Sequence, residues 1–393
     1  GVTIHSFFQM HFGPHIPGHS QQFDQKSGKD QQKIFDRSQR FSKEKINIIK
    51  SLDLLVIDEI SMVRADLLDS IDEVLRRFRD RSKPFGGVQL LMIGDLQQLA
   101  PVAKDEEWDI LRPYYDTIFF FGSRALQKTD FTTIELKHIY RQSDETFIAL
   151  LNKVRDNKMD QQAIDALNQR YIPNFNPGND EGYITLTTHN YQSQAINEAK
   201  LKQLKGHPHH FTAVVEGDFP EYSYPTDFEL VLKAGAQVMF VKNDISREKL
   251  FYNGKIGKVI RIEDDTSFVK CEGDYEVIPV QQAEWQNNKY SINDETREIT
   301  ETPVGSFIQY PLKLAWAITI HKSQGLTFER AIIDANAAFA HGQVYVALSR
   351  CKTMEGMVLS SRISQDCIKS DVSVKGFSAN AEMNQPGEKE LIA

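Results

Sequence analysis

Two short apolar runs, each ending in an acid, flank one amphipathic stretch and limit what this chain can fold into. The first run is LDLLVIDE at 52–59, and the second is VQLLMIGD at 88–95. Between them, apolar residues recur at helical spacing, at Leu67, Leu68, Ile71, Val74, Leu75 and Phe78. KPFGG at 83–87 ends this pattern, because proline and glycine do not continue a helix. Strand, helix and strand at this length predict a parallel crossover unit.

The same alternation continues through much of the chain. We predict strands at 117–121, 131–136 and 183–190, and helices at 143–157 and 191–204. The stretch YIPNFNPGNDEG supplies the proline and glycine that separate two halves. The sequence therefore predicts an α/β protein whose two halves each hold a parallel sheet.

Residues 243–310 have a different character from the rest. The short runs YNGKIGKVIRI, SFVKC and YEVIPV are separated by turn residues, which is typical of a small antiparallel β-barrel. The α/β pattern resumes at 311, so the barrel is predicted to interrupt the second half. We predict domains at 1–150 and 151–375, followed by a flexible tail at 376–393.

Charge is unevenly distributed along the chain. The net charge of −8 argues weakly against nucleic acid as a partner. Residues 24–50, however, hold eight Lys or Arg against four Asp or Glu, and residues 241–262 hold six against two, so each stretch is net +4. A local basic surface matters more for phosphate binding than the total charge. The alternative is that both stretches are solvated faces.

Cysteine usage and hydropathy bear on the compartment. The three cysteines, Cys271, Cys351 and Cys367, are far apart and form no metal-binding pair, so we expect a reducing, intracellular environment. No apolar stretch approaches the 18 residues of a membrane span, and no secretory signal pattern is seen. We therefore expect no membrane association.

The acids that end the first apolar run suit a nucleotide triphosphatase. Asp58 at a strand end can hold Mg²⁺, and Glu59 beside it can orient or deprotonate the attacking water. Ligands of doubly wound sheets bind outside the carboxyl ends of the strands. Gln98, after the neighbouring run, can sense a terminal phosphate. The alternatives are an exposed acidic turn and an ordinary loop glutamine.

Two arginines lie in polar segments that follow predicted apolar elements. Arg141 is in HIYRQSD and Arg350 is in YVALSRCK. A planar guanidinium suits the charge spread over a transferring phosphoryl group. The alternative for each residue is a surface salt bridge.

AITIHKSQGLTFERAIID at 317–334 is the most distinctive stretch. Polar groups and a glycine cluster at the end of its apolar strand, namely Thr319, His321, Lys322, Ser323, Gln324 and Gly325. Hydroxyl, amide and basic groups at one strand end can bind phosphate or sugar oxygens, and glycine permits close backbone approach. An ordinary surface loop would not be expected to hold so many polar groups directly after a buried strand.

The order of these motifs resembles that of superfamily one helicases. GVTIHSFF, LLVIDEIS, KPFGGVQLLMIGDLQQLAPV, YRQ, AITIHKSQGLTF and VYVALSR are most similar to the Pif (petite integration frequency) DNA helicases, relatives of the RecD and Dda helicases. The stretch from Asp66 to Gly87 resembles that family's signature between its second and third motifs. The resemblance runs from residue 1 to about 362.

The resemblance implies a fold and a motor activity. It implies two RecA-like domains that close on ATP and Mg²⁺, move 5′ to 3′ along single-stranded DNA and unwind duplex. It also implies a wedge insertion at about 12–48 in the first domain and identifies the inserted barrel as Src-homology-three-like.

The resemblance also implies residue roles. Asp58 and Glu59 would handle Mg²⁺ and water, and Gln98, Arg141 and Arg350 would reach the γ-phosphate. The implied DNA contacts are Thr3, His5, Ser6 and Phe7 of the first domain and Thr319, His321, Lys322 and Ser323 of the second. Gln324 and Gly325 would link that second set toward the nucleotide.

The implied partners are nucleic acids. Forked duplexes, four-stranded guanine structures and RNA–DNA hybrids all fit the family, which also implies a monomer located with intracellular DNA and roles in repair, recombination and telomere maintenance. A non-enzymatic DNA-binding remnant and an RNA-directed motor stay as alternatives, because backbone contacts distinguish the two sugars only through the 2′-hydroxyl.

The family's phosphate loop is not found in this sequence. FGPHIPGHS at 12–20 has similar glycine spacing, but His19 replaces the lysine, and Pro14 and Pro17 each remove a backbone N–H. We interpret the spacing as accidental. A phosphate loop on its strand and helix needs about 30 residues, which we expect before residue 1.

Overall fold

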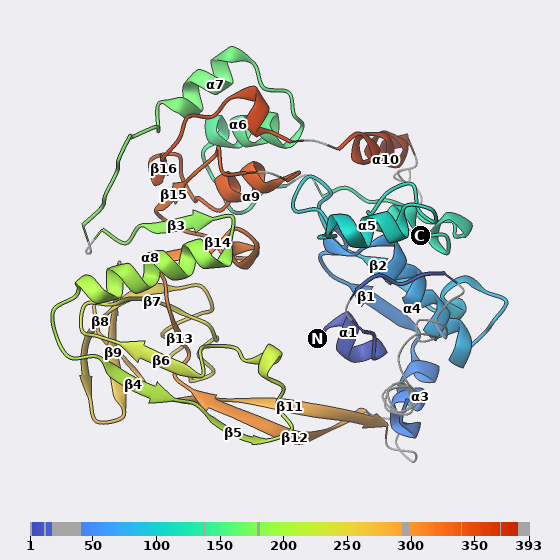
Figure 1. The fold of residues 1–393 in the computed structure, drawn as a ribbon, viewed down its shortest axis with the longest axis horizontal. Coiled ribbons are helices and arrows are strands. Elements are labelled where there is room, and N and C mark those ends of the chain that lie inside the picture. The colour runs from blue at the N-terminus through green and yellow to red at the C-terminus, as the bar shows by residue number, and fades with distance from the viewer. Residues whose placement is uncertain are drawn as a thin grey trace. The chain divides into compact units, whose positions relative to one another are not determined.

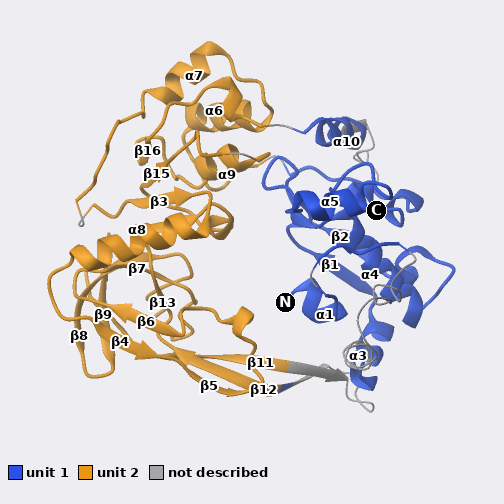
Figure 2. Ribbon diagram, viewed as in Figure 1, with its two compact units in different colours: residues 1–137, 290–302, 371–393 blue, residues 138–289, 303–370 orange. Residues whose placement is uncertain are grey.

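The computed structural model describes residues 2–11, 13–17, 41–136, 138–178, 181–292, 299–338, 340–369 and 371–383 (Figure 1). These residues divide into two compact units, each considered by itself (Figure 2). Unit 1 comprises residues 1–137, 290–302 and 371–393, and unit 2 comprises residues 138–289 and 303–370. Most of the predicted wedge at 12–48, including residues 18–40, lies outside the described residues.

Unit 1 is built around one long amphipathic helix and a pair of parallel strands. Its described helices are α1 (Ile4–Phe8), α3 (Lys43–Ser51), α4 (Ala65–Phe78), α5 (Asp105–Leu111) and α10 (Val372–Met383). Its strands are β1 (Leu54–Ile57) and β2 (Gln89–Met92), and its 3-10 turns are η1 (Ile60–Met62), η2 (Pro84–Gly87), η3 (Phe120–Gly122) and η4 (Leu126–Lys128).

The predicted crossover unit is confirmed. Strands β1 and β2 pair in parallel, with Leu54 opposite Gln89 and Ile57 opposite Met92. Leu68, Ile71 and Leu75 of α4 are fully buried in the core below this sheet, which explains the helical spacing of the apolar residues.

Among the described residues, the other face of the β1–β2 sheet carries half-exposed apolar residues. Leu54, Val56 and Leu91 alternate with core-facing residues, and their side chains are 46%, 51% and 47% exposed. Strand geometry sends successive side chains to opposite faces, so this exposure belongs to one continuous apolar face.

Two predicted strands of unit 1 are wrong. Residues 117–121 run into the 3-10 turn η3, with only one isolated bridge between Arg64 and Phe119. Residues 131–136 have no regular secondary structure. The aromatic residues that suggested strands are instead used for packing, with Phe119 and Phe120 both buried.

Helix α10 contains residues 376–383 of the predicted tail. Its Val374 is fully buried, and the Phe377 ring stacks on that of Phe121 with centroids 4.5 Å apart. Burial of Val374 and the stacking of the partly buried Phe377 ring explain why a polar segment forms a helix here.

In the described part of the chain, unit 2 contains a parallel sheet with its helices and most of three antiparallel sheets. The parallel sheet has the strand order β14-β3-β15-β16 among the described residues. The elements of this part are α6 (Glu145–Arg155), α7 (Gln161–Asn168), β3 (Ile184–Thr187), α8 (Asn190–Gln203), β14 (Ala317–Thr319), η6 (His321–Ser323), β15 (Ala331–Ile333), α9 (Gln343–Ser349), β16 (Met357–Leu359) and η7 (Gln365–Cys367). Parallel pairing among strands separated by helices confirms the α/β class.

The antiparallel strands extend beyond the predicted 243–310. Their sheets have the orders β10-β9-β8-β7-β13, β11-β12-β5 and β4-β6. The strands are β4 (His209–Thr212), β5 (Val214–Gly217), β6 (Glu229–Leu232), β7 (Gln237–Phe240), β8 (Ile256–Glu263), β9 (Thr266–Cys271), β10 (Ile278–Val280), β11 (Ala283–Ile292), β12 (Ile299–Gln309) and β13 (Leu312–Leu314), with the 3-10 turn η5 (Glu221–Ser223). They enclose a core that includes Val238, Val259, Val269 and Tyr310.

Among the described residues, no helix combines the length and the apolar character that a membrane crossing requires.

Candidate functional site

The acids predicted at the end of β1 lie beside the end of β2. The backbone N–H of Ile93 donates to the Ile57 carbonyl at 2.9 Å, and the N–H of Ile60 donates to the Ile93 carbonyl at 2.9 Å. These bonds join the two strand ends directly around Asp58 and Glu59. The carboxyl edge of the sheet therefore carries both acids together, as the sequence predicted.

Glu59 has an unusual backbone conformation. Its φ of 50° and ψ of 45° place it in the left-handed region, and its N–H donates to Asp58 Oδ1 at 2.9 Å. A non-glycine residue in this region is uncommon, and such strain concentrates at functional sites.

Gly94 permits this turn to pack against β2. A Cβ atom at Gly94 would lie 3.0 Å from both the backbone N and Cγ2 of Ile60. Any larger residue would push the 59–61 turn away from the end of β2. Gly94 of the IGD sequence is therefore required because a larger side chain would not fit against Ile60.

Gln98 reaches the same edge, and Asp95 holds it. The Gln98 amide Nε2 donates to Asp95 Oδ2 at 3.3 Å, and its backbone N–H donates to the Asp95 carbonyl at 3.0 Å. Asp95 also accepts from the Gln97 N–H at 3.0 Å. Asp95 has no role predicted from the sequence, although it ends an apolar run just as Asp58 does.

Asp58 fits the coordination that Mg²⁺ requires beside a nucleotide. Its side chain is exposed, and the described part of the chain offers no partner for Oδ2. Mg²⁺ in nucleotide sites usually takes one or two carboxylates together with substrate phosphates and water. No cluster of three or more acids, histidines or cysteines suited to a metal is found among the described residues.

The two predicted arginines meet at the end of helix α9. Arg141 Nη1 donates to the Ser349 carbonyl at 3.4 Å, while Arg350 Nη2 donates to Ser349 Oγ at 3.1 Å. Arg350 is only 2% exposed, and its Nε donates to the Val346 carbonyl at 3.2 Å. Burial lowers the pKa of the Arg141 guanidinium. A phosphate contact by Arg350 would require its side chain to leave these partners.

Gln142 is a residue that the sequence analysis missed. It is 7% exposed, and its Nε2 donates to the Ser349 carbonyl at 3.0 Å and to the Cys351 carbonyl at 2.9 Å. These two carbonyls lie on either side of Arg350. Gln142 therefore ties the YRQ segment to the backbone that carries Arg350. Its place next to Arg141 was the available sequence signal.

The polar groups after β14 divide into buried and accessible ones. Thr319 and Ser323 are 4% and 0% exposed, and Ser323 Oγ donates to the Ile320 carbonyl at 2.7 Å. Lys322 and Gly325 are exposed, and Gly325 has a φ of 75°. Of these four residues, Lys322 and Gly325 are accessible to a ligand. The buried hydroxyls of Thr319 and Ser323 instead form hydrogen bonds within the turn.

His321 and Gln324 lie between these extremes. Burial lowers the pKa of the His321 imidazole below its usual value, which favours the neutral ring. Among the described residues, the buried Nε2 of Gln324 has no hydrogen-bond partner. A buried amide without a partner costs free energy, so this N–H group is suited to donate to a ligand oxygen.

The N-terminal motif forms the short helix α1. Thr3 caps it, with Oγ1 accepting from the Ser6 N–H at 3.3 Å. Thr3 and Ser6 are exposed, His5 is half-buried, and the Phe7 ring lies 4.4 Å from the Lys45 ammonium. Unit 1 therefore brings these four predicted contacts together on one turn of helix.

Sequence and structure comparisons with known proteins indicate the same family. A sequence model described as PIF1-like helicase matches residues 1–165. A crystal structure of Bacteroides sp Pif1 in complex with ADP-AlF4 is 38% identical, with a TM-score of 0.85 over 98% of this chain and 84% of that chain. The chain belongs to the PIF1-like helicase family.

Further relatives of this PIF1-like chain agree. The ATP-dependent DNA helicase PIF1 of Rattus norvegicus is 37% identical over 315 residues, which is 77% of this chain and 45% of that protein. The ATP-dependent DNA helicase Pif1 of Psychrobacter sp. (strain PRwf-1) is 32% identical over 364 residues, 78% of this chain and 53% of that protein. The chain thus spans about half the length of these curated relatives.

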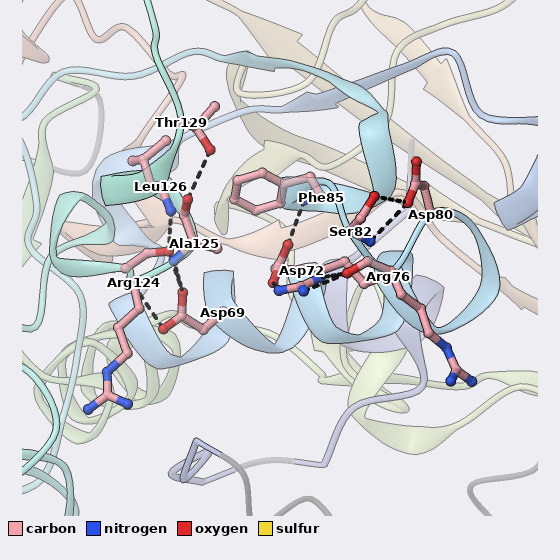
Figure 3. Close-up of polar contacts among 12 residues, drawn as sticks. Asp69, Asp72, Arg76, Asp80, Ser82, Phe85, Arg124, Ala125, Leu126 and Thr129 are labelled. Atoms are coloured by element: carbon pink, nitrogen blue, oxygen red, sulfur yellow. Dashed lines mark hydrogen bonds and ion pairs between the residues drawn. The ribbon is translucent and has the colours of Figure 1, made fainter.

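The segment that resembles the PIF1-like signature contains a row of buried acids. Asp66, Asp69 and Asp72 are 2%, 8% and 5% exposed. Residues three apart on a helix share a face, so α4 presents three carboxylates in line. Figure 3 shows Asp69 and Asp72 of this row bonded to two separate loops.

Each acid of the row fixes a different segment of unit 1. Asp66 accepts from Arg64 Nη2 at 2.8 Å and from the His15 N–H at 2.9 Å. Asp72 accepts from the Phe85 N–H in the turn that leads into β2. Burial raises the pKa of the Asp72 carboxyl. The signature segment thus fixes the turn that leads into β2.

Asp69 makes the most extensive contacts of the three. It accepts from the Tyr115 hydroxyl at 2.9 Å, from the Ser123 hydroxyl, and from the Arg124 and Ala125 N–H groups at 3.1 and 3.0 Å. Burial, together with Asp69, raises the pKa of the Tyr115 phenol, which therefore stays protonated as a donor. Asp69 is the anchor of residues 115–125.

Acid should weaken the attachment of residues 13–15 to α4. Burial, helped by His11 and Arg64, lowers the pKa of His15 to about 4 from 6.5. The unfolded chain binds the proton more readily, so the stability from neutral His15 is present above pH 6.5 and is lost as the pH falls toward 4. We expect a loss of about 2 kcal/mol between pH 7 and pH 5.

Hydrogen exchange of residues 13–17 at pH 5 and 7, corrected for intrinsic rates, measures this loss. His15→Gln should flatten the dependence, whereas His207→Gln, at an exposed position in unit 2, should not. Equal pH dependence in the wild type and His15→Gln would contradict the assignment. His5 and His11 also have pKa values lowered by burial. We expect them to cause the pH dependence of exchange that remains in His15→Gln.

Proposed function

We propose that this chain forms the motor of an ATP-dependent DNA helicase. One observation carries the proposal. Asp58 and Glu59 follow β1 at the carboxyl edge of the β1–β2 sheet, where Asp95 follows β2 and accepts a hydrogen bond from the Gln98 amide. Family membership supports it, since relatives are named ATP-dependent DNA helicases and one neighbour is Bacteroides Pif1 bound to ssDNA, with 39% identity and a TM-score of 0.66.

In this proposal the acids divide the work at the nucleotide. Asp58 would hold Mg²⁺, which would neutralise phosphate charge, and Glu59 accepts a proton from the attacking water. Gln98 contacts the terminal phosphate, with its amide kept in place by Asp95. Arg141 and Arg350 stabilise charge on the transferring group, and Gln324 and Gly325 join the nucleotide to the DNA site.

The DNA contacts come from two segments. Thr3, His5, Ser6 and Phe7 bind the strand from unit 1, and Lys322 and His321, with the turn shaped by Thr319 and Ser323, bind it from unit 2. Exposed Lys322 is suited to a phosphate. We further propose RecA-like domains, a wedge and a Src-homology-three-like barrel with the boundaries given above.

ATP hydrolysis by the full-length gene product, with and without single-stranded DNA, tests the proposal. We expect stimulation that depends on Mg²⁺. Absence of stimulation would favour the non-enzymatic DNA-binding alternative. Partial duplexes with a 5′ or a 3′ single-stranded tail test direction, and we expect unwinding only with the 5′ tail. Equal stimulation by RNA would instead point to an RNA-directed motor.

Gln142→Ala should lower kcat for ATP hydrolysis about tenfold, because losing two buried hydrogen bonds, each worth about 1 kcal/mol, releases the backbone around Arg350. The KM for ATP should change little if Arg350 acts in the transition state. Gln142→Glu should be at least as damaging, since a carboxylate repels both carbonyls. Gln161→Ala, at an exposed position in α7, is the control. A normal kcat in Gln142→Ala would remove this positioning role.

A further inference from the structure

A charged pocket lies where helices α3 and α4 end in unit 1. It has a volume of about 380 Å³, and its charged lining residues are Lys50, Arg79, Asp80 and Lys83. Phe78 and the glycines of the 84–87 turn complete the wall. Small-molecule pockets are usually mostly apolar, whereas this one is lined by three cations and one acid, a net positive charge that favours an anion.

The charge comes from one run of sequence. RRFRDRSK at 76–83 holds five Lys or Arg and one Asp, so it is net +4, a signal that the sequence analysis passed over. Part of this charge serves the helix ends. Arg76 Nε donates to the Arg81 carbonyl at 2.9 Å, and Arg79 Nη1 donates to the Ile49 carbonyl at 3.3 Å. Cations at helix C-termini are stabilising for this reason alone.

Two lysines of the pocket lining, Lys50 and Lys83, do not bind helix-end carbonyls in this way. Lys50 is exposed on the last turn of α3, and the described residues offer its ammonium no ion pair or hydrogen bond. Lys83 lies 3.9 Å from Asp80, with its side chain 68% exposed, so that pair is weak. Asp80 is held by Ser82, whose N–H and hydroxyl donate at 2.9 and 2.6 Å. Both ammonium groups are therefore available to one ligand.

We propose that this pocket binds a phosphate group of a nucleic-acid backbone between Lys50 and Lys83, with Arg79 adding positive potential. The inference rests on the proposed function and adds a contact outside its motifs. A protein partner is disfavoured, because protein interfaces have apolar cores and are depleted in lysine. Phe78, the aromatic residue in the wall, already packs on Phe41 with ring centroids 5.0 Å apart.

The salt dependence of DNA binding tests this proposal in the full-length protein. Each phosphate contact adds about 0.9 to the slope of log K against log salt on duplex DNA. Because the proposal places one phosphate between them, Lys50→Ala combined with Lys83→Ala should reduce the slope for a fluorescein-labelled forked DNA by about 0.9. At 150 mM salt the affinity should fall about fivefold.

The matched control removes two other exposed lysines of unit 1, by Lys104→Ala with Lys128→Ala. This control should keep the wild-type slope. A wild-type slope in the pocket variant would overturn the proposal, and so would an equal reduction in both variants, which would mean a general charge effect. None of the four lysines has been placed in the motor site.

Inorganic phosphate distinguishes a backbone phosphate from a free one. If the pocket variant loses calorimetric binding of phosphate but keeps the wild-type DNA slope, the pocket binds free anions and the proposal falls. The proposed function is judged separately, because the pocket variant should keep its single-stranded-DNA-stimulated kcat at saturating DNA. A wild type without stimulated hydrolysis defeats the helicase proposal, whatever the salt slopes are.

Discussion

Glu59→Gln should lower the turnover of ATP by at least about a hundredfold, because a general base contributes about 10² to 10⁴ to rate. Nucleotide affinity should stay within a few-fold of wild type, since Asp58 and Gln98 keep their oxygens and amide. Glutamine has the size of glutamate, so the left-handed turn at φ 50° is not further strained. Only the ability to accept a proton is removed.

The measurement is steady-state hydrolysis with saturating single-stranded DNA, together with binding of a fluorescent ATP analogue. Glu106→Gln, at an exposed position in the first turn of α5, is the matched control and should be indistinguishable from wild type. Wild-type turnover in Glu59→Gln would remove Glu59 from the catalytic role. Loss of nucleotide binding in the same variant would show that the carboxylate holds the turn instead.

The sequence predicted the parts of the site that follow from strand periodicity. Each apolar run ends in an acid, and parallel pairing necessarily brings the two ends to one edge. Asp58 and Glu59 were found in this way. Asp95 satisfies the same rule, yet its role depends on a bond to Gln98 that only the fold reveals.

Other features depend on contacts between distant segments. Gln142 lies some two hundred positions from the carbonyls that it binds, so neither spacing nor composition indicates the pairing. Residues 117–121 are rich in aromatics, which have high strand propensity, but Phe119 and Phe120 are buried within unit 1 and the segment runs into the 3-10 turn η3. Strands β7 and β13 lie outside 243–310, since their five-stranded sheet joins segments on both sides of that range.

In the signature segment, one part could be predicted from sequence periodicity and another part depends on contacts with distant segments. Its apolar spacing predicted α4, but Asp66, Asp69 and Asp72 occupy positions that an amphipathic pattern assigns to water. They are buried because each meets donors from another segment. A buried carboxylate with several donors tolerates the loss of water, whereas its donors do not tolerate the loss of the carboxylate.

Asp69→Ala should therefore destabilise unit 1 by about 4 kcal/mol. The change strands two hydroxyls and two backbone N–H groups, at about 1 to 3 kcal/mol for each group that stays buried, with partial relief from entering water. Hydrogen exchange should show the loss first at residues 115–126. The effect should reach Glu59 only indirectly, so residual ATP turnover per folded molecule should exceed that of Glu59→Gln.

Asp109→Ala is the control for this prediction. Asp109 pairs with Arg112 at 3.2 Å, and both side chains are about two-thirds exposed. An exposed pair of this kind contributes about 0 to 1 kcal/mol, so the control should unfold at nearly the wild-type denaturant concentration. Equal stability of the two variants would mean that the Asp69 donors find other partners. The signature would then owe its stability to its apolar face alone.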